Sequence, residues 1–165
     1  MSAPTRLADL VVGLGQPDRG DDAVGPLVAR EVARLLASDG LPRVAVVERD
    51  EPADLMDTWS GHDRVAVVDA VRSGAAPGTV HVLDAGASAG PLSPEAWAAT
   101  GRGGTHALGL AAVVELARAL GTLPDRVVVV GVEAASFEHG APLSPAAAAA
   151  VSSAAAHVVS VLSEP

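Results

Sequence analysis

Three polar residues, Asp22, Asp69 and His106, are the side chains of this sequence best spaced to do chemistry together. Asp22 closes a glycine-rich segment that follows the apolar run Leu10–Leu14 and precedes a helical pattern. Asp69 follows the apolar run Arg64–Val68, and His106 ends a long loop directly before another helical pattern. Ligands of open α/β sheets bind beyond the carboxyl ends of the strands. We therefore expect two carboxylates and an imidazole to converge on one crevice.

Such a set of groups has two chemical uses. Carboxylate and imidazole ligands without a thiolate suit nickel, zinc, iron or manganese. The same groups can act as an acid–base centre, since the ordinary pKa of histidine lies near neutral pH. The three residues leave both uses open.

Each of these residues also has an ordinary structural interpretation. An acid at the start of a helix, such as Asp22, caps the helix or complements its dipole. Asp69 has the place of a turn-forming acid at the end of a strand, and His106 has that of a helix cap or a solvated side chain. Only their coincidence at one sheet edge favours a joint site.

Short valine-rich runs alternate with helical patterns along the chain, and runs that are apolar almost throughout are typical of strands buried on both faces. We predict strands at Leu10–Leu14, Val44–Glu48, Arg64–Val68, Thr79–Leu83 and Arg126–Val132. Helices are predicted over Val24–Leu36, Ala53–Trp59, Leu108–Leu120 and from Ser144–Pro145 onward. This alternation indicates a three-layer α/β/α sandwich with a mostly parallel, twisted sheet of about five strands, one of them antiparallel, and helices on both faces. We expect a single domain over residues 1–165.

Composition narrows the function classes. The chain is 49% apolar with only 2% aromatic residues, so we expect a core of Val, Leu and Ala. A net charge of −9 disfavours nucleic acids and anionic membrane surfaces as partners. The absence of cysteine excludes disulfides, thiol nucleophiles and thiolate metal sites. With neither a signal-peptide pattern nor an apolar run of membrane-span length, the sequence predicts a cytoplasmic protein that binds neither nucleic acid nor membrane.

Other candidate motifs fit less well. The glycine spacing after the first strand is not that of a dinucleotide fingerprint, and neither a Walker A nor a Gly-x-Ser-x-Gly serine hydrolase motif is present. The remaining histidines have no metal-ligand spacing to one another, and we interpret His62 and His81 as structural or solvated. Glu138 and His139, in a loop after the last strand, are weaker candidates for the rim of the same crevice.

Four blocks of the sequence resemble, in order, the hydrogenase maturation protease family. The first block, Val12–Gly25, and the third, Thr105–Leu110, are fairly specific. The second and fourth blocks are weaker alone and comprise Val67–Ala70 with Ala76–Thr79, and Gly131–Glu133 with Phe137–Glu138 and Leu143–Pro145. Together the blocks cover essentially the whole chain.

This resemblance implies an endopeptidase that removes the C-terminal extension of the large subunit of nickel–iron hydrogenase after nickel insertion. It implies Asp22, Asp69 and His106 as the metal-contacting residues, and we expect the same three to be catalytic. The nickel would be supplied by the precursor and read as the recognition signal, so no permanent cofactor is expected. Oxygen and nitrogen ligands without a thiolate suit probing nickel without extracting it. We also expect Gly15, Gln16 and Asp50 to contact the substrate.

The sequence departs from the family pattern after the second predicted strand, where the family usually carries an Asp-Gly pair. Asp50 can stand for the acid, but Glu51 replaces the glycine. A backbone conformation that requires glycine would be costly for Glu51, so substrate choice is expected to differ at this turn. Two alternatives to a protease are a non-cleaving, nickel-sensing or chaperone-like binder of the precursor, and an unrelated small-molecule α/β enzyme.

Overall fold

The computed structural model describes residues 8–165 apart from 41–42, 94 and 97–104, and for 105–108 it describes the backbone alone. Its strands are β1 (Asp9–Leu14), β2 (Val44–Arg49), β3 (Arg64–Val71), β4 (Val80–Asp84) and β5 (Arg126–Glu133). Its α-helices are α1 (Val24–Asp39), α2 (Leu55–Thr58), α4 (Thr105–Leu120) and α5 (Pro145–Ser163). Short 3-10 segments are η1 (Gly20–Ala23), η2 (Pro52–Asp54) and η3 (Ala87–Ala89).

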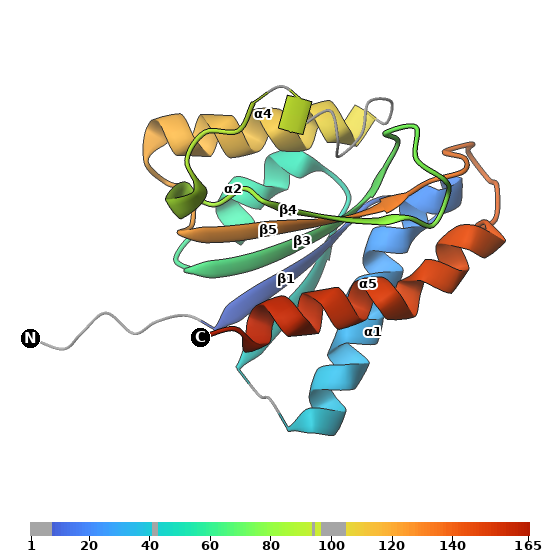
Figure 1. Ribbon diagram of the computed structural model, residues 1–165, viewed down its shortest axis with the longest axis horizontal. Helices are drawn as coiled ribbons and strands as arrows, with labels where there is room; N and C mark the ends of the chain where they lie inside the picture. The colour runs from blue at the N-terminus through green and yellow to red at the C-terminus, as the bar shows by residue number, and fades with distance from the viewer. Residues whose placement is uncertain (1–7, 41–42, 94, 97–104) are drawn as a thin grey trace, which may run out of the picture.

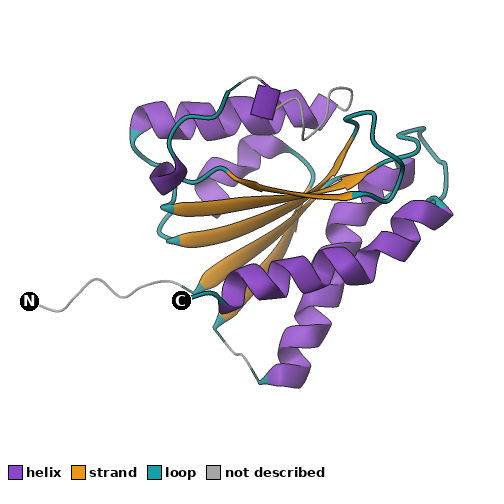
Figure 2. Ribbon diagram, in the orientation of Figure 1, coloured by secondary structure: helices purple, strands orange, loops and turns teal. Residues whose placement is uncertain are grey.

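The five strands form one sheet in the order β2-β1-β3-β5-β4 (Figure 1). β1 pairs in parallel with β2 and β3, β3 pairs in parallel with β5, and β4 runs antiparallel to β5. Helices α2 and α4 cover one face of the sheet and α1 and α5 cover the other, as Figure 2 also shows. The predicted three-layer α/β/α sandwich with one antiparallel strand is confirmed.

Alternating residues of the central strand β3 face opposite helical layers. Ala66 and Val68 belong to the core cluster that includes α1 and α5, whereas Val65 and Val67 belong to the cluster that includes α2 and α4. Asp69 lies two residues beyond Val67 in the same strand, so it faces the α4 layer.

Helix α5 begins as predicted, with the Ser144 hydroxyl accepting a hydrogen bond from the N–H of Ala147 at 3.2 Å. Among the described residues α5 is the one helix long and apolar enough to cross a membrane. Its buried residues, such as Ala154 and Val158, belong to the core that it forms with α1 and β5. This is the packing expected of a core helix in an Ala- and Val-rich fold.

Four strands end later than the apolar pattern predicts, β2 at Arg49, β4 at Asp84, and β3 and β5 at Val71 and Glu133. β3 continues past Val68 to Val71, and β5 continues past Val132 to Glu133, because the pairing between the two strands continues to their ends. The carboxyl edge of the sheet therefore includes polar and small residues that apolar periodicity does not assign to strands.

Candidate active site

Asp22 lies in η1, between the end of β1 and the start of α1, and is 2% exposed. Its Oδ2 accepts a hydrogen bond from the backbone N–H of Gln16 at 2.8 Å. The N-cap residues of η1 and α1 are Arg19 and Ala23, and neither helix has a side-chain cap. The capping interpretation of Asp22 is therefore wrong, and its carboxylate is held instead by the glycine-rich loop.

Gly15 is the residue that allows this loop to close on Asp22. Its φ is 144°, and a Cβ placed on it would lie 2.0 Å from the backbone oxygen of Asp22. Its N–H donates to the backbone oxygen of Arg49, at the end of β2, at 3.0 Å. The structure thus brings the predicted residues Gly15, Gln16 and Asp22 together next to the end of β2.

Asp69 is fully buried, with 0% exposure, and lies inside β3. The turn-forming interpretation of this residue is wrong because the strand continues to Val71. A carboxylate at this position is removed from bulk water on the face of the sheet that α4 covers. A carboxylate buried at the carboxyl edge of the sheet is a candidate for a functional group.

The packing of α1 brings Asp22 and Asp69 to the same edge of the sheet. A Cβ placed on Gly25, in the first turn of α1, would lie 2.1 Å from the backbone oxygen of Leu14 and 2.7 Å from that of Val68. The helix start therefore rests on the carboxyl ends of β1 and β3, and η1 contacts β3. The expectation that both acids lie at one edge of the sheet holds for this pair.

His106 lies in the first turn of α4. Its side chain is outside the described residues, so its predicted role remains a prediction. A Cβ placed on Gly109, one turn further on, would lie 3.1 Å from Cγ of Pro52 in η2. The start of α4 thus packs on the segment that follows the carboxyl end of β2. Among the described side chains, no group of three or more His, Cys, Asp or Glu residues could hold a metal ion.

Asp50 and Glu51 are exposed and follow β2 directly. Glu51 has φ −124° and ψ 138°, an extended conformation that any residue adopts. The backbone cost expected for replacing the family glycine is therefore absent. Asp50 follows Arg49, whose backbone oxygen accepts the N–H of Gly15, so it lies beside the glycine-rich loop.

Asp21 is a structural residue that the sequence did not identify. It is 1% exposed, and its carboxylate accepts hydrogen bonds from the N–H of Ala135 at 2.7 Å, the N–H of Ser144 at 2.7 Å and the hydroxyl of Ser144 at 2.8 Å. The two adjacent acids thus have different roles. Asp21 joins three segments of the chain, and Asp22 belongs to the candidate site.

Glu133 forms a second buried polar cluster that the sequence did not identify. It is 1% exposed and accepts hydrogen bonds from the N–H and hydroxyl of Ser73, at 2.8 and 2.7 Å, and from the N–H of Gly74 at 3.1 Å. His81 Nε2 lies 3.1 Å from its Oε2. Burial alone would raise the pKa of the Glu133 carboxyl, but these hydrogen bonds outweigh it and the pKa is lowered.

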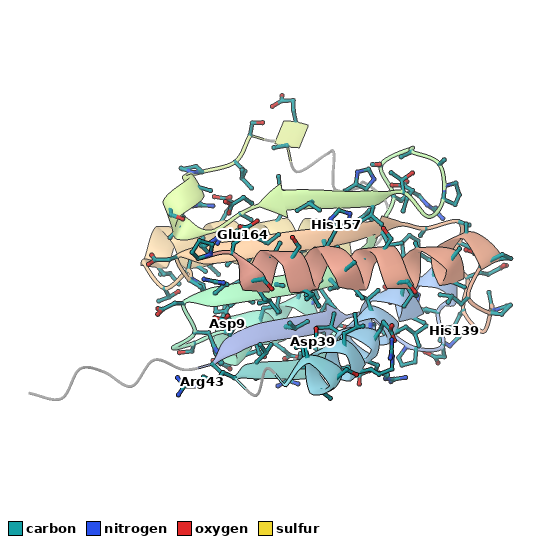
Figure 3. The ribbon with its side chains drawn as sticks, turned by 60° about the horizontal axis from the view of Figure 1, so that its bottom comes forward. Asp9, Asp39, Arg43, His139, His157 and Glu164 are labelled. Carbon is teal, nitrogen blue, oxygen red and sulfur yellow. The ribbon has the colours of Figure 1, made fainter. Side chains whose placement is uncertain are left out.

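The weaker rim candidates, Glu138 and His139, are exposed in the loop after β5. His139 Nε2 lies 3.8 Å from the Asp18 carboxylate in the loop after β1. Figure 3 shows His139 at the far end of the molecule from Arg43 and Asp9, which lie at the amino edge of the sheet. Glu138 and His139 thus lie at the same end of the sheet as the glycine-rich loop. Among the contacts between described residues, none joins either of them to Asp22 or Asp69.

Comparisons with known proteins agree with this fold. A hydrogenase-maturating endopeptidase, HybD, from E. coli has a TM-score of 0.72 and 25% identity, with 94% of this chain and 92% of that chain covered. A hydrogenase 2 maturation peptidase from a Thaumarchaeota archaeon has a TM-score of 0.63 and 27% identity, with 94% and 98% covered. An endopeptidase from Escherichia coli, solved in solution, has a TM-score of 0.77 and 24% identity over 94% and 92%, which supports the fold alone.

A search of curated protein sequences gives no match. A family model described as hydrogenase maturation protease matches residues 27–161, a span that contains Asp69 and His106. That span is well over half of the 165-residue chain. The buried acids at the sheet edge therefore belong to a peptidase fold, and the chain is a member of the hydrogenase maturation protease family.

Proposed function

We propose that this peptidase removes the C-terminal extension of a nickel–iron hydrogenase large-subunit precursor after nickel insertion, and that it recognises the nickel held by that precursor. The observation that carries the proposal is the placement of two buried carboxylates, Asp22 and Asp69, at one edge of the sheet. Neither carboxylate caps a helix through its side chain, and Asp69 lies in a strand and not in a turn.

Asp22, Asp69 and His106 are the proposed contacts to the precursor's nickel. In a buried position the attraction between a carboxylate and a divalent cation is stronger than in water. Carboxylate oxygens and an imidazole compete poorly for an ion that softer thiolates already hold. The site would therefore sense the nickel of the precursor without removing it, and a precursor without nickel would not be processed.

Peptide hydrolysis consumes one water molecule. The water oxygen bonds to the carbonyl carbon, the C–N bond breaks and the departing amine takes up a proton. The chain contributes fixed positions to this step, since the N–H of Gln16 holds the Asp22 carboxylate and Gly15 closes the loop around it. We propose that Gly15, Gln16 and Asp50 contact the substrate around this point, and that the reaction takes place in the cytoplasm.

The intact mass of the precursor after incubation with this protein tests the proposal. Nickel-loaded precursor is expected to lose the mass of its C-terminal extension, whereas nickel-free precursor is expected to keep its full mass. Unchanged mass of the nickel-loaded form would contradict processing. Equal shortening of both forms would contradict nickel as the recognition signal.

A further inference from the structure

Arg72 is an exposed arginine that follows the end of β3 directly, three positions after Asp69. At the rise of an extended strand this separation corresponds to about 10 Å. Its Cζ lies 5.1 Å from the centroid of the Phe137 ring, which belongs to the loop after β5. An arginine that packs on an aromatic ring is thus separated from Asp69 by about the length of three extended residues.

The backbone on both sides of Arg72 is fastened to β5. On one side, Val71 ends β3 in register with Glu133, and its backbone oxygen accepts the N–H of Ala134 at 2.8 Å. On the other side, the buried Glu133 carboxylate accepts the N–H groups of Ser73 and Gly74. Little backbone freedom therefore remains for Arg72 to lose when it binds a ligand, which favours its use as a binding residue.

A second guanidinium lies close to the same ring. Arg19, in the glycine-rich loop, donates from Nε to the backbone oxygen of Phe137 at 3.4 Å. Phe137, the only phenylalanine of the chain, therefore lies next to cations from the loops after β1 and β3. The segment after β1 also carries Asp22, and Asp69 lies in β3, three positions before Arg72.

These two cations differ in their charge partners from most of the other arginines that the structure describes, Arg43 and Arg49 excepted. Five arginines lie within 4 Å of a carboxylate of their own chain: Arg30, Arg34, Arg64, Arg118 and Arg126. Within the part of the chain that the structure describes, Arg19 and Arg72 form no such ion pair. The exposed acid Asp18 nearby is placed instead against His139. Two guanidiniums without a close carboxylate partner among the described residues thus lie near the carboxyl edge of the sheet, in a chain whose net charge is −9.

A guanidinium above an aromatic ring still has N–H donors in its own plane, and their fork matches a carboxylate. We propose that Arg72, with Arg19 beside it, binds a carboxylate in the C-terminal extension of the precursor and so helps to determine which precursor is processed. This inference rests on the proposed function. The net charge of −9 disfavours binding of an acidic segment elsewhere on the chain, so the arginines would also fix its position relative to Asp69. The carboxylate is either an acidic side chain or the terminal carboxylate of the extension.

The test measures binding separately from cleavage. A labelled synthetic peptide that spans the extension is titrated with the full chain in a fluorescence anisotropy experiment without nickel. Arg72→Ala is expected to weaken binding by roughly five-fold to ten-fold, and Arg72→Lys by less, because lysine retains the charge and loses the fork. Arg43→Ala is the matched control, since Arg43 is exposed at the opposite edge of the sheet (Figure 3).

Altered peptides identify the carboxylate. Either amidation of the peptide C-terminus or replacement of its acidic side chains by amides is expected to weaken binding to the unmodified protein as much as Arg72→Ala does. The peptide change that has this effect identifies the carboxylate, and it should weaken binding to the Arg72→Ala protein no further. Equal binding by the Arg72→Ala and Arg43→Ala proteins would overturn the proposal. It would also be overturned if the effect of Arg72→Ala added fully to the effect of each of the two peptide changes. If the protein fails to cleave nickel-loaded precursor but binds the peptide through Arg72, the proposed function fails and the carboxylate site stands. If it cleaves nickel-loaded precursor but neither cleavage nor peptide binding depends on Arg72, the proposed function stands and the carboxylate site fails.

Discussion

Ser144 donates two hydrogen bonds to the buried carboxylate of Asp21, from its backbone N–H at 2.7 Å and from its hydroxyl at 2.8 Å. The same hydroxyl accepts the N–H of Ala147 and so caps α5. Asp21 is adjacent to Asp22, which means that the loop carrying a candidate active-site acid is tied to the start of a core helix. The position of the site therefore depends on a contact between residues 123 positions apart.

Replacement of Asp21 by alanine is expected to destabilise the protein by about 2 to 4 kcal/mol, because it removes three hydrogen bonds to a buried carboxylate, from the N–H groups of Ala135 and Ser144 and from the Ser144 hydroxyl. Urea denaturation followed by circular dichroism measures the change. Asp18→Ala is the control, since the Asp18 side chain is 70% exposed, and it is expected to change stability by less than about 0.5 kcal/mol. Similar effects of the two substitutions would show that Asp21 does not join these segments.

Replacement of Gly15 by alanine tests whether the glycine-rich loop positions Asp22. A methyl group would lie 2.0 Å from the backbone oxygen of Asp22, and φ of 144° is unfavourable for alanine. We expect a loss of stability above about 3 kcal/mol together with loss of precursor processing. At Gly40, which also has positive φ but no atom within 4 Å of the added Cβ, alanine is expected to cost only about 1 kcal/mol and to retain processing. Retained processing by Gly15→Ala would mean that the loop need not keep this conformation.

The lowered pKa of Glu133 predicts a specific dependence of stability on pH. Because the pKa in the folded protein lies below the ordinary value of 4.5, the ionised carboxyl stabilises the fold above about pH 4.5. This contribution is lost as pH falls below that value towards the folded-state pKa. Glu133→Gln should therefore be less stable at pH 7, by about 1 to 3 kcal/mol, and should lose less stability on acidification than the unmodified protein. Urea midpoints from pH 7 down to about pH 3 measure both effects, and parallel curves for the two proteins would be the contrary result.

The strands, helices and layer order followed from the sequence because valine-rich runs and amphipathic patterns depend on local periodicity. The edge shared by Asp22 and Asp69 also followed, since parallel strands present their carboxyl ends on one side of a sheet. Periodicity missed the last residues of β3, so Asp69 was expected in a loop. That position is a strand because β5 continues to pair with it, which is a contact between distant segments.

The buried polar contacts could not be predicted for the same reason. Asp21 and Ser144 were each visible as single residues, and Ser144 was predicted as an N-cap, but nothing local indicates that one binds the other. Glu133 meets Ser73 across 60 positions. At Glu51 the sequence predicted a backbone cost from the absence of glycine, whereas the extended conformation there needs no glycine. Family patterns record which residue is usual, and only coordinates give the conformation that this chain adopts.

The intact mass of nickel-loaded large-subunit precursor after incubation with Asp69→Asn protein tests the role of the buried acids most directly. Asparagine has nearly the volume of aspartate and lacks its charge, so the fold is expected to survive while processing falls by at least about 100-fold. Asp39→Asn, at the exposed end of α1 (Figure 3), is the matched control and is expected to process normally. The predicted result is full-length precursor with Asp69→Asn and shortened precursor with Asp39→Asn. Precursor shortened at the same rate by both proteins would contradict the assignment of Asp69 to the active site.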